Sequence, residues 1–208
     1  MRRALLPLAV AGVVAALALL LRPGGTSHSQ KPQPRTVEVR VTGPTGVSEV
    51  ATGFVAGPSR VVTVAHVLDS VGALTVQDGR GGPRRAEALK VDRRDDLALL
   101  AVPGLPAAGS EPAAAGVRIV VRRRGAWTAL PTQVRRRFTV HVHGRPGDPV
   151  YTRPALELAA SVRIGDSGAP VITARGELAG VVFARSEDRP GTAYAVDAKA
   201  VGALLGPG

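Results

Sequence analysis

The sequence predicts an all-β protein, built as a sandwich or a barrel from short strands. Val37, Val39 and Val41 alternate with charged residues, which is the pattern of a half-buried strand. Aromatic residues make up only 3% of the chain, so Val, Ala and Leu must fill the core, and β-branched Val favours strands. The chain has no cysteine, which excludes disulfides, thiolate metal sites and a cysteine nucleophile.

Short apolar segments separated by turn residues continue along the chain in two similar sets. We expect the first six strands at 37–41, 53–56, 60–64, 74–77, 88–91 and 97–102. We expect the second six at 117–121, 138–142, 155–159, 171–173, 178–184 and 193–196. A stretch rich in Pro, Gly and Ala at 103–115 joins the two sets, and one short helix is expected at 198–205.

The N-terminus predicts a transmembrane helix. Residues 4–21 carry no charge and would form a helix about 27 Å long, just enough to span a bilayer. The segment follows two arginines and runs directly into Arg22 and Pro23, without the small-residue site of a cleaved signal peptide, so we favour an uncleaved anchor over a signal peptide. The expected location is therefore the cell membrane, single-pass, with the folded part outside the cytoplasm; a secreted protein is the alternative.

The expected domains follow from these segments. Residues 1–22 are the anchor or signal peptide, and residues 23–35, rich in Gly, Ser, Gln and Pro, form a flexible linker. Residues 36–110 and 111–208 then form the two β units.

The net charge of +11 comes almost wholly from 24 arginines, against 3 lysines, with the densest clusters at 122–124 and 135–137. Such charge could attract a polyanion, or it could reflect a compositional bias that leaves solvated arginines in loops. Aromatic side chains that would stack on bases are nearly absent and no nucleic-acid motif occurs. We therefore expect no nucleic-acid partner.

Three short sequence segments indicate a catalytic site. Ser167 stands between glycines in the run GDSGAP at 165–170, His66 follows an apolar strand, and Asp96 precedes another. In this order they form the parts of a nucleophilic triad. Ser167 would be the nucleophile, and His66 would take its proton and return it to the leaving group. Asp96 would orient the imidazole and stabilise its charged form.

The backbone around the serine supplies a second element of this chemistry. The amides of Gly165 and Ser167 are the expected donors to a developing oxyanion, because glycine tolerates the backbone angles that turn them inward. No cofactor and no metal is expected. A site at His141 and His143 would lack an evident third ligand.

The carboxylate of the triad has competitors. Asp96 adjoins the apolar strand, which can anchor a carboxylate at a barrel rim, and it is preferred. Asp92 and Asp95 lie among arginines and are interpreted as solvated partners, although Asp95 stays an alternative.

The segments around His66, Asp96 and Ser167, with Gly53 and Phe54, resemble the trypsin-like peptidases of the HtrA/DegP group across nearly all of residues 50–200. The segments at 151–152, 180–184 and 194–196 are similar to the MarP-type membrane-anchored serine proteases of actinobacteria. The resemblance implies two perpendicular six-stranded antiparallel barrels. His66 and Asp96 would come from the first barrel and Ser167 from the second, in a serine endopeptidase acting on proteins or peptides.

The resemblance also implies a substrate pocket. It would be lined by Ser161, Val162, Phe183, Ala184, Arg185 and Thr192. None of these is acidic, which argues against cleavage after Lys or Arg. A small or medium aliphatic residue before the scissile bond is expected, with an acidic preference through Arg185 as the weaker alternative.

Two departures from the HtrA pattern bear on activity, Asp166 before the serine and Ala169 after it. A buried Asp166 needs a partner, and we expect a neighbouring arginine such as Arg163 or a backbone amide. If these residues disturb the oxyanion site, the chain is a catalytically inactive trypsin-like domain used as an anchored binding or sensing module. A third hypothesis, that the chain is an arginine-rich protein that binds a polyanion, has less support.

Overall fold

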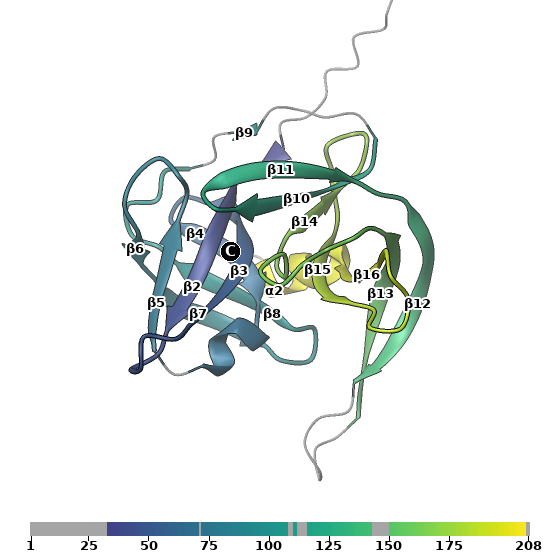
Figure 1. Cartoon of the computed structure of the whole chain (residues 1–208), viewed down its shortest axis with the longest axis horizontal. Coiled ribbons are helices and arrows are strands. Elements are labelled where there is room, and N and C mark those ends of the chain that lie inside the picture. Colours follow the sequence, from purple (N-terminus) through teal and green to yellow (C-terminus); the bar gives the residue numbers. More distant parts are fainter. Residues whose placement is uncertain (1–32, 71, 108–109, 112–115, 143–149, 207–208) are drawn as a thin grey trace, which may run out of the picture.

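The computed structural model describes residues 33–70, 72–107, 110–111, 116–142 and 150–206. The predicted transmembrane helix at 4–21 lies outside them, and none of the helices they contain is long and apolar enough to cross a bilayer. The described chain forms two curled antiparallel sheets with one short α-helix near its C-terminus (Figure 1). The predicted all-β class is confirmed.

The first sheet is antiparallel and curled. Its strands are β2 (Thr36–Thr42), β3 (Ser48–Gly57), β4 (Arg60–Val64), β5 (Ala73–Gln77), β6 (Arg84–Arg85), β7 (Glu87–Asp92) and β8 (Leu97–Ala101). Their order is β6-β5-β2-β3-β4-β8-β7. The two edge strands, β6 and β7, are separated only by Ala86, so the ends of the sheet are covalent neighbours and the sheet must curl into a barrel.

The second sheet repeats this arrangement. Its strands are β10 (Arg118–Arg123), β11 (Ala126–Pro131), β12 (Val134–Val142), β13 (Tyr151–Ala159), β14 (Pro170–Ile172), β15 (Leu178–Arg185) and β16 (Thr192–Asp197). Their order is β11-β10-β14-β15-β16-β13-β12, and the edge strands β11 and β12 are again consecutive in the chain.

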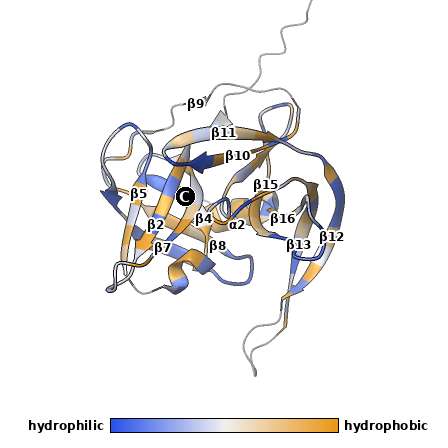
Figure 2. Ribbon diagram, in the orientation of Figure 1, coloured by the Kyte–Doolittle hydropathy of each residue, from blue (hydrophilic) through white to orange (hydrophobic). Residues whose placement is uncertain are grey.

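Small apolar side chains fill both barrels, as the scarcity of aromatic residues predicts. One cluster of Val, Ala and Leu lies inside the first barrel and another inside the second. A third cluster lies between them and includes Phe54, Leu97, Val181 and Leu204. The helix α2 (Ala198–Leu205) contributes its apolar face to this third cluster, and Figure 2 shows apolar strands around it. The barrels therefore pack against each other through a cluster of apolar side chains.

Polar contacts fix α2 at both ends. The carboxylate of Asp197 accepts a hydrogen bond from the amide of Lys199 at 3.0 Å and caps the N-terminus. Lys90 of β7 donates to the carbonyl oxygens of Ala203 and Leu204, at 3.2 and 3.1 Å, near the C-terminus. A residue of the first barrel thereby holds the helix that ends the second.

All twelve predicted strands are found, with shifts of a few residues, and so is the helix at 198–205. The expected six strands per barrel are corrected to seven. In the first barrel the added strand is the two-residue β6. In the second it is β11, and two residues separate its end at Pro131 from the start of β12. Residues of the predicted linker also enter the fold, since β1 (Gln33–Pro34) pairs with β9 (Ser110–Glu111) and the Arg35 side chain is buried.

Candidate active site

His66 and Asp96 are brought together by strand register. Strands β4 and β8 pair with Val64 opposite Leu97, so the residues after Val64 meet the residue before Leu97. The ring nitrogen Nδ1 of His66 lies 2.8 Å from Oδ2 of Asp96. The amide of His66 donates to the other carboxylate oxygen at 2.9 Å, and the amide of Ala65 donates to the Asp96 carbonyl at 3.1 Å. The carboxylate is thus fixed against the first turn of η1 (His66–Asp69).

The structure favours Asp96 over its competitors. Its φ of +55° lies in the left-handed region that non-glycine residues rarely adopt, and strained residues of this kind gather at functional sites. Asp92 instead accepts a hydrogen bond from the amide of Asp95 at 3.1 Å. Burial raises the pKa of Asp95, with a smaller contribution from Asp92. Asp96 is the carboxylate that contacts His66.

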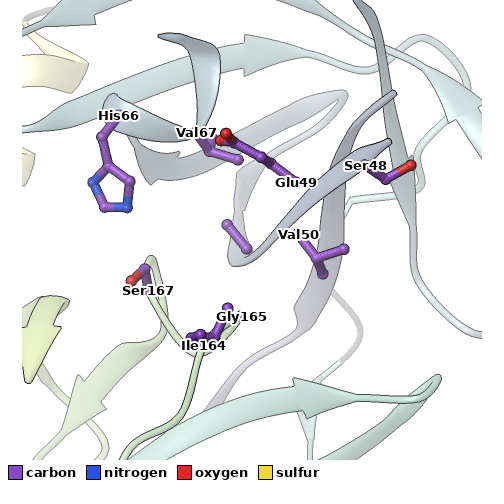
Figure 3. A pocket seen from close by; sticks show the side chains of 9 residues that line it. Ser48, Glu49, Val50, His66, Val67, Ile164, Gly165 and Ser167 are labelled. Carbon is purple, nitrogen blue, oxygen red and sulfur yellow. The ribbon is translucent and has the colours of Figure 1, made fainter. Parts of the chain in front are cut away.

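Ser167 lies on the loop that precedes β14, and this loop is docked on the first barrel. Its carbonyl accepts a hydrogen bond from the amide of Thr52 at 2.8 Å, and the Thr52 hydroxyl donates to the Gly165 carbonyl at 2.9 Å. At Gly168 a side chain is excluded, because a Cβ would lie 1.9 Å from the Thr52 oxygen. Ser167 and His66 line the same pocket and lie next to each other in Figure 3.

The loop leaves two amides available to a ligand. Those of Asp166, Gly168 and Ala169 each donate to a backbone carbonyl. Those of Gly165 and Ser167 donate to no acceptor within the described residues. A φ of +92° at Gly165 belongs to the region where glycine is favoured. These are the two donors that the sequence predicts for an oxyanion.

Asp166 anchors this loop from the inside. Its side chain is 1% exposed and accepts hydrogen bonds from Nε of Arg123 at 2.9 Å, from Nη2 of Arg123, and from the amide of Arg163 at 2.7 Å. The predicted backbone amide is therefore present, but the guanidinium belongs to Arg123 and not to Arg163. Ala169 is fully buried in the core of the second barrel, so it leaves the loop unobstructed.

The profile of the trypsin-like peptidase domain matches residues 51–181. The chain belongs to the trypsin-like serine peptidase family.

Relatives of this peptidase agree with that assignment. Serine proteases Rv3671c and MT3772 of two Mycobacterium tuberculosis strains, H37Rv and CDC 1551, are each 35% identical to it over 182 residues. The match covers 83% of this chain and 46% of each relative, so the chain spans about half the length of the curated relatives it matches.

Solved structures give the same fold. The active form of the Rv3671c protease superposes with a TM-score of 0.73 at 32% identity, over 86% of this chain and 82% of that one. The MamO protease domain of Magnetospirillum magneticum has a TM-score of 0.67 at 20% identity, over 86% of this chain and all of that one, and shows the fold alone.

Sequence reasoning about this peptidase missed a buried arginine beside Asp96. Arg153 of β13 is 5% exposed, and its Nη1 lies 3.9 Å from the Asp96 oxygen that contacts His66. Its guanidinium carbon lies 5.1 Å from the centre of the Phe183 ring, while its Nε has no hydrogen-bond partner. Burial lowers the pKa of Arg153, and the carboxylate of Asp96 opposes that shift. A buried cation with an unbonded donor is costly, which makes its place beside the His66–Asp96 pair a functional signal.

Acidic neighbours determine the titration of His66. The hydrogen bond that the His66 ring donates to Asp96 raises the pKa of His66 above its usual 6.5, and the charges of Asp69 and Glu49 add to this effect. Partial burial of the ring opposes it. The His66 side chain is 45% exposed, so part of the imidazole ring is open to solvent.

The residues predicted to line the substrate pocket differ in accessibility. Ser161 and Arg185 are exposed, and Phe183 and Ala184 are half-buried. Val162 and Thr192 are buried, at 8% and 3%, and the Thr192 hydroxyl accepts a hydrogen bond from Arg135 at 3.0 Å. The specificity assigned to this set stays a prediction.

Several arginines of the two clusters have structural partners in this peptidase. Arg122 is buried and donates to backbone carbonyls of Thr36 and Gly125, at 3.2 and 2.8 Å. Arg136 binds Glu157, and Arg123 binds Asp166. Much of this charge therefore serves the fold. His141 lies on exposed β12 and His143 lies outside the described residues; within those residues no group of three or more His, Cys, Asp or Glu side chains could hold a metal.

Proposed function

We propose that the chain is a serine endopeptidase that works through His66, Asp96 and Ser167. The observation that carries the proposal is the hydrogen-bonded pair of His66 and Asp96 beside Ser167, on a loop with two available amides. Family membership supports the same chemistry.

The reaction would begin when His66 accepts the proton of the Ser167 hydroxyl and the oxygen attacks the carbonyl carbon of the scissile bond. The negative charge on the carbonyl oxygen would be stabilised by the amides of Gly165 and Ser167. The protonated imidazole, stabilised by the Asp96 carboxylate, then gives its proton to the leaving amine as the C–N bond breaks. Water, activated by His66, hydrolyses the acyl-enzyme and regenerates the serine.

A fluorophosphonate probe tests this proposal. The protein should be labelled at Ser167, because the probe reacts with a serine that a neighbouring base activates. Ser167→Ala should abolish labelling, and His66→Ala should slow it greatly. If the wild type is unlabelled although correctly folded, the domain is a catalytically inactive binding or sensing module instead.

We further propose that residues 4–21 anchor the protein in the cell membrane, with the peptidase outside the cytoplasm. The support is the uncharged 18-residue segment after two arginines. The full chain should sediment with membranes and resist carbonate extraction, and its mass should include the segment. Release of a shorter protein into the medium would instead indicate a cleaved signal peptide.

A further inference from the structure

A pocket of about 510 Å³ opens beside His66 and Ser167, on the side of β3 and η1 (Figure 3). It is lined by Ser48, Glu49, Val50, Ala51, His66, Val67, Ile164, Gly165 and Ser167. The first barrel contributes one wall. The loop at 164–169 that carries Ser167, here called the nucleophile loop, contributes the other. A peptide bound across the triad must therefore pass through it on one side of Ser167.

This pocket belongs to the leaving-group side of the scissile bond. The acyl side of the substrate is expected to contact the predicted substrate-pocket residues, which lie on β15, on β16 and just before the nucleophile loop. None of those residues lines this pocket. The leaving amine must lie within reach of His66, which gives it a proton. The residues that follow the scissile bond thus extend past His66, toward β3.

The walls of the pocket combine an apolar surface with one carboxylate. Ile164 is 92% exposed, an unusual state for an isoleucine, and Val50 and Val67 face it across the pocket. Glu49 is exposed, and its side chain points into the pocket toward Val67 in Figure 3. No hydrogen bond or ion pair engages the Glu49 carboxylate in the described part of the chain.

The side chains that match both features are long and cationic. Lysine and arginine place an aliphatic stem on apolar surface and keep the charge at the tip, where a carboxylate can meet it. An acidic side chain in the same place would be repelled by Glu49. This charge is notable in a chain of net charge +11, whose field would otherwise favour acidic segments.

We infer that this pocket selects substrates with a lysine or arginine at the first or second position after the scissile bond, and that Glu49 is the residue that recognises its charge. The inference rests on the proposed peptidase function and gives it a substrate class. Because the ion pair is solvent-exposed, the gain is modest, about two- to fivefold in kcat/KM over a neutral residue. The gain shrinks in high salt, because exposed charges are screened.

The test compares internally quenched peptides that share one acyl side and carry Lys, Gln or Glu at the first or the second position after the scissile bond. For each enzyme variant the ratio of kcat/KM between peptides is the readout, since a change in His66 itself cancels in that ratio. The wild type should prefer Lys, Glu49→Gln should lose this preference for Lys, and Glu49→Lys should prefer Glu. Glu177→Lys, an exposed charge change outside the pocket, should keep the wild-type ratios.

The outcomes separate this inference from the function on which it rests. If Ser167 is labelled and the peptides are cleaved, but the wild type shows no preference or Glu49→Gln retains it, the inference is overturned and the peptidase function stands. If Ser167 is not labelled and no peptide is cleaved, both the inferred preference and the proposed peptidase function are wrong.

Discussion

The ion pair between Arg123 and Asp166 should control both the stability and the activity of this peptidase, and Arg123→Gln tests it. Asp166 is 1% exposed and receives two of its three hydrogen bonds from Arg123. Breaking a buried pair on one side costs about 3–5 kcal/mol, because the remaining charge stays buried without its counterion. Arg123 is 27% exposed, so water can partly replace it, and we expect about 3 kcal/mol.

The effect on catalysis should be about as large as the effect on folding. Asp166 lies between Gly165 and Ser167, so a displaced carboxylate turns their amides away from the oxyanion. Loss of one such donor typically lowers kcat by about 10²–10³. Arg123→Gln should therefore lose about that factor in kcat, and Arg123→Lys should recover part of it because the charge remains.

The measurements are urea unfolding and peptide hydrolysis, with Arg137→Gln as the matched control. Arg137 also pairs with a carboxylate, that of Asp197, but is 66% exposed. Its loss should cost less than about 1 kcal/mol and leave kcat unchanged. A folded Arg123→Gln protein with wild-type kcat would show that the loop does not depend on this pair. In a double-mutant cycle, adding Asp166→Asn to Arg123→Gln should cost much less than either change alone.

Three further predictions concern the triad, the nucleophile loop and α2. The raised pKa of His66 means that kcat/KM falls as the pH drops through a value above 6.5, since only the neutral imidazole accepts a proton. Arg153→Gln removes a positive charge near the triad and should move this acidic limb to higher pH, whereas Arg153→Lys should not. Gly168→Ala should cost about 3 kcal/mol or more in urea unfolding, because its Cβ would overlap a backbone oxygen of β3, whereas Gly57→Ala meets nothing within 4 Å and should be nearly neutral. Lys90→Met removes a cation from the C-terminus of α2 and should lower Tm by about 1–4 °C.

For each of these predictions, one experimental result would contradict the reasoning. An acidic limb that stays in place in Arg153→Gln, with activity merely reduced at every pH, would assign Arg153 a packing role alone. Equal stabilities of Gly168→Ala and Gly57→Ala would mean that the loop can move away from β3. An unchanged Tm in Lys90→Met would mean that α2 is held by its apolar face only.

Local patterns in the sequence carry much of the fold. Alternating valines predict β2 correctly, and the expected strands and final helix recur in the structure, because period and turn residues act over a few positions. The same local logic misses β6, which has two residues, and β11, whose exposed residues lack a regular apolar alternation. The number of strands per barrel was therefore wrong by one.

The pairing of His66 with Asp96 could be predicted from the sequence because each residue flanks an apolar strand. The structure shows that these two strands, β4 and β8, are hydrogen-bonded neighbours. The partner of Asp166 could not. Arg123 lies 43 positions away in one of several arginine-rich segments, and no local pattern distinguishes it from Arg163.

By itself the sequence determined the strand-rich class, the order of the three candidate catalytic residues and the glycines around Ser167, since each depends on residue type and near neighbours. The tertiary structure decided which charges meet. Arg153 reaches Asp96, Arg123 reaches Asp166 and Glu49 reaches the pocket beside His66 and Ser167 only because the curling of two sheets brings distant strands together. Such contacts depend on strand order and packing direction, which a one-dimensional pattern does not specify.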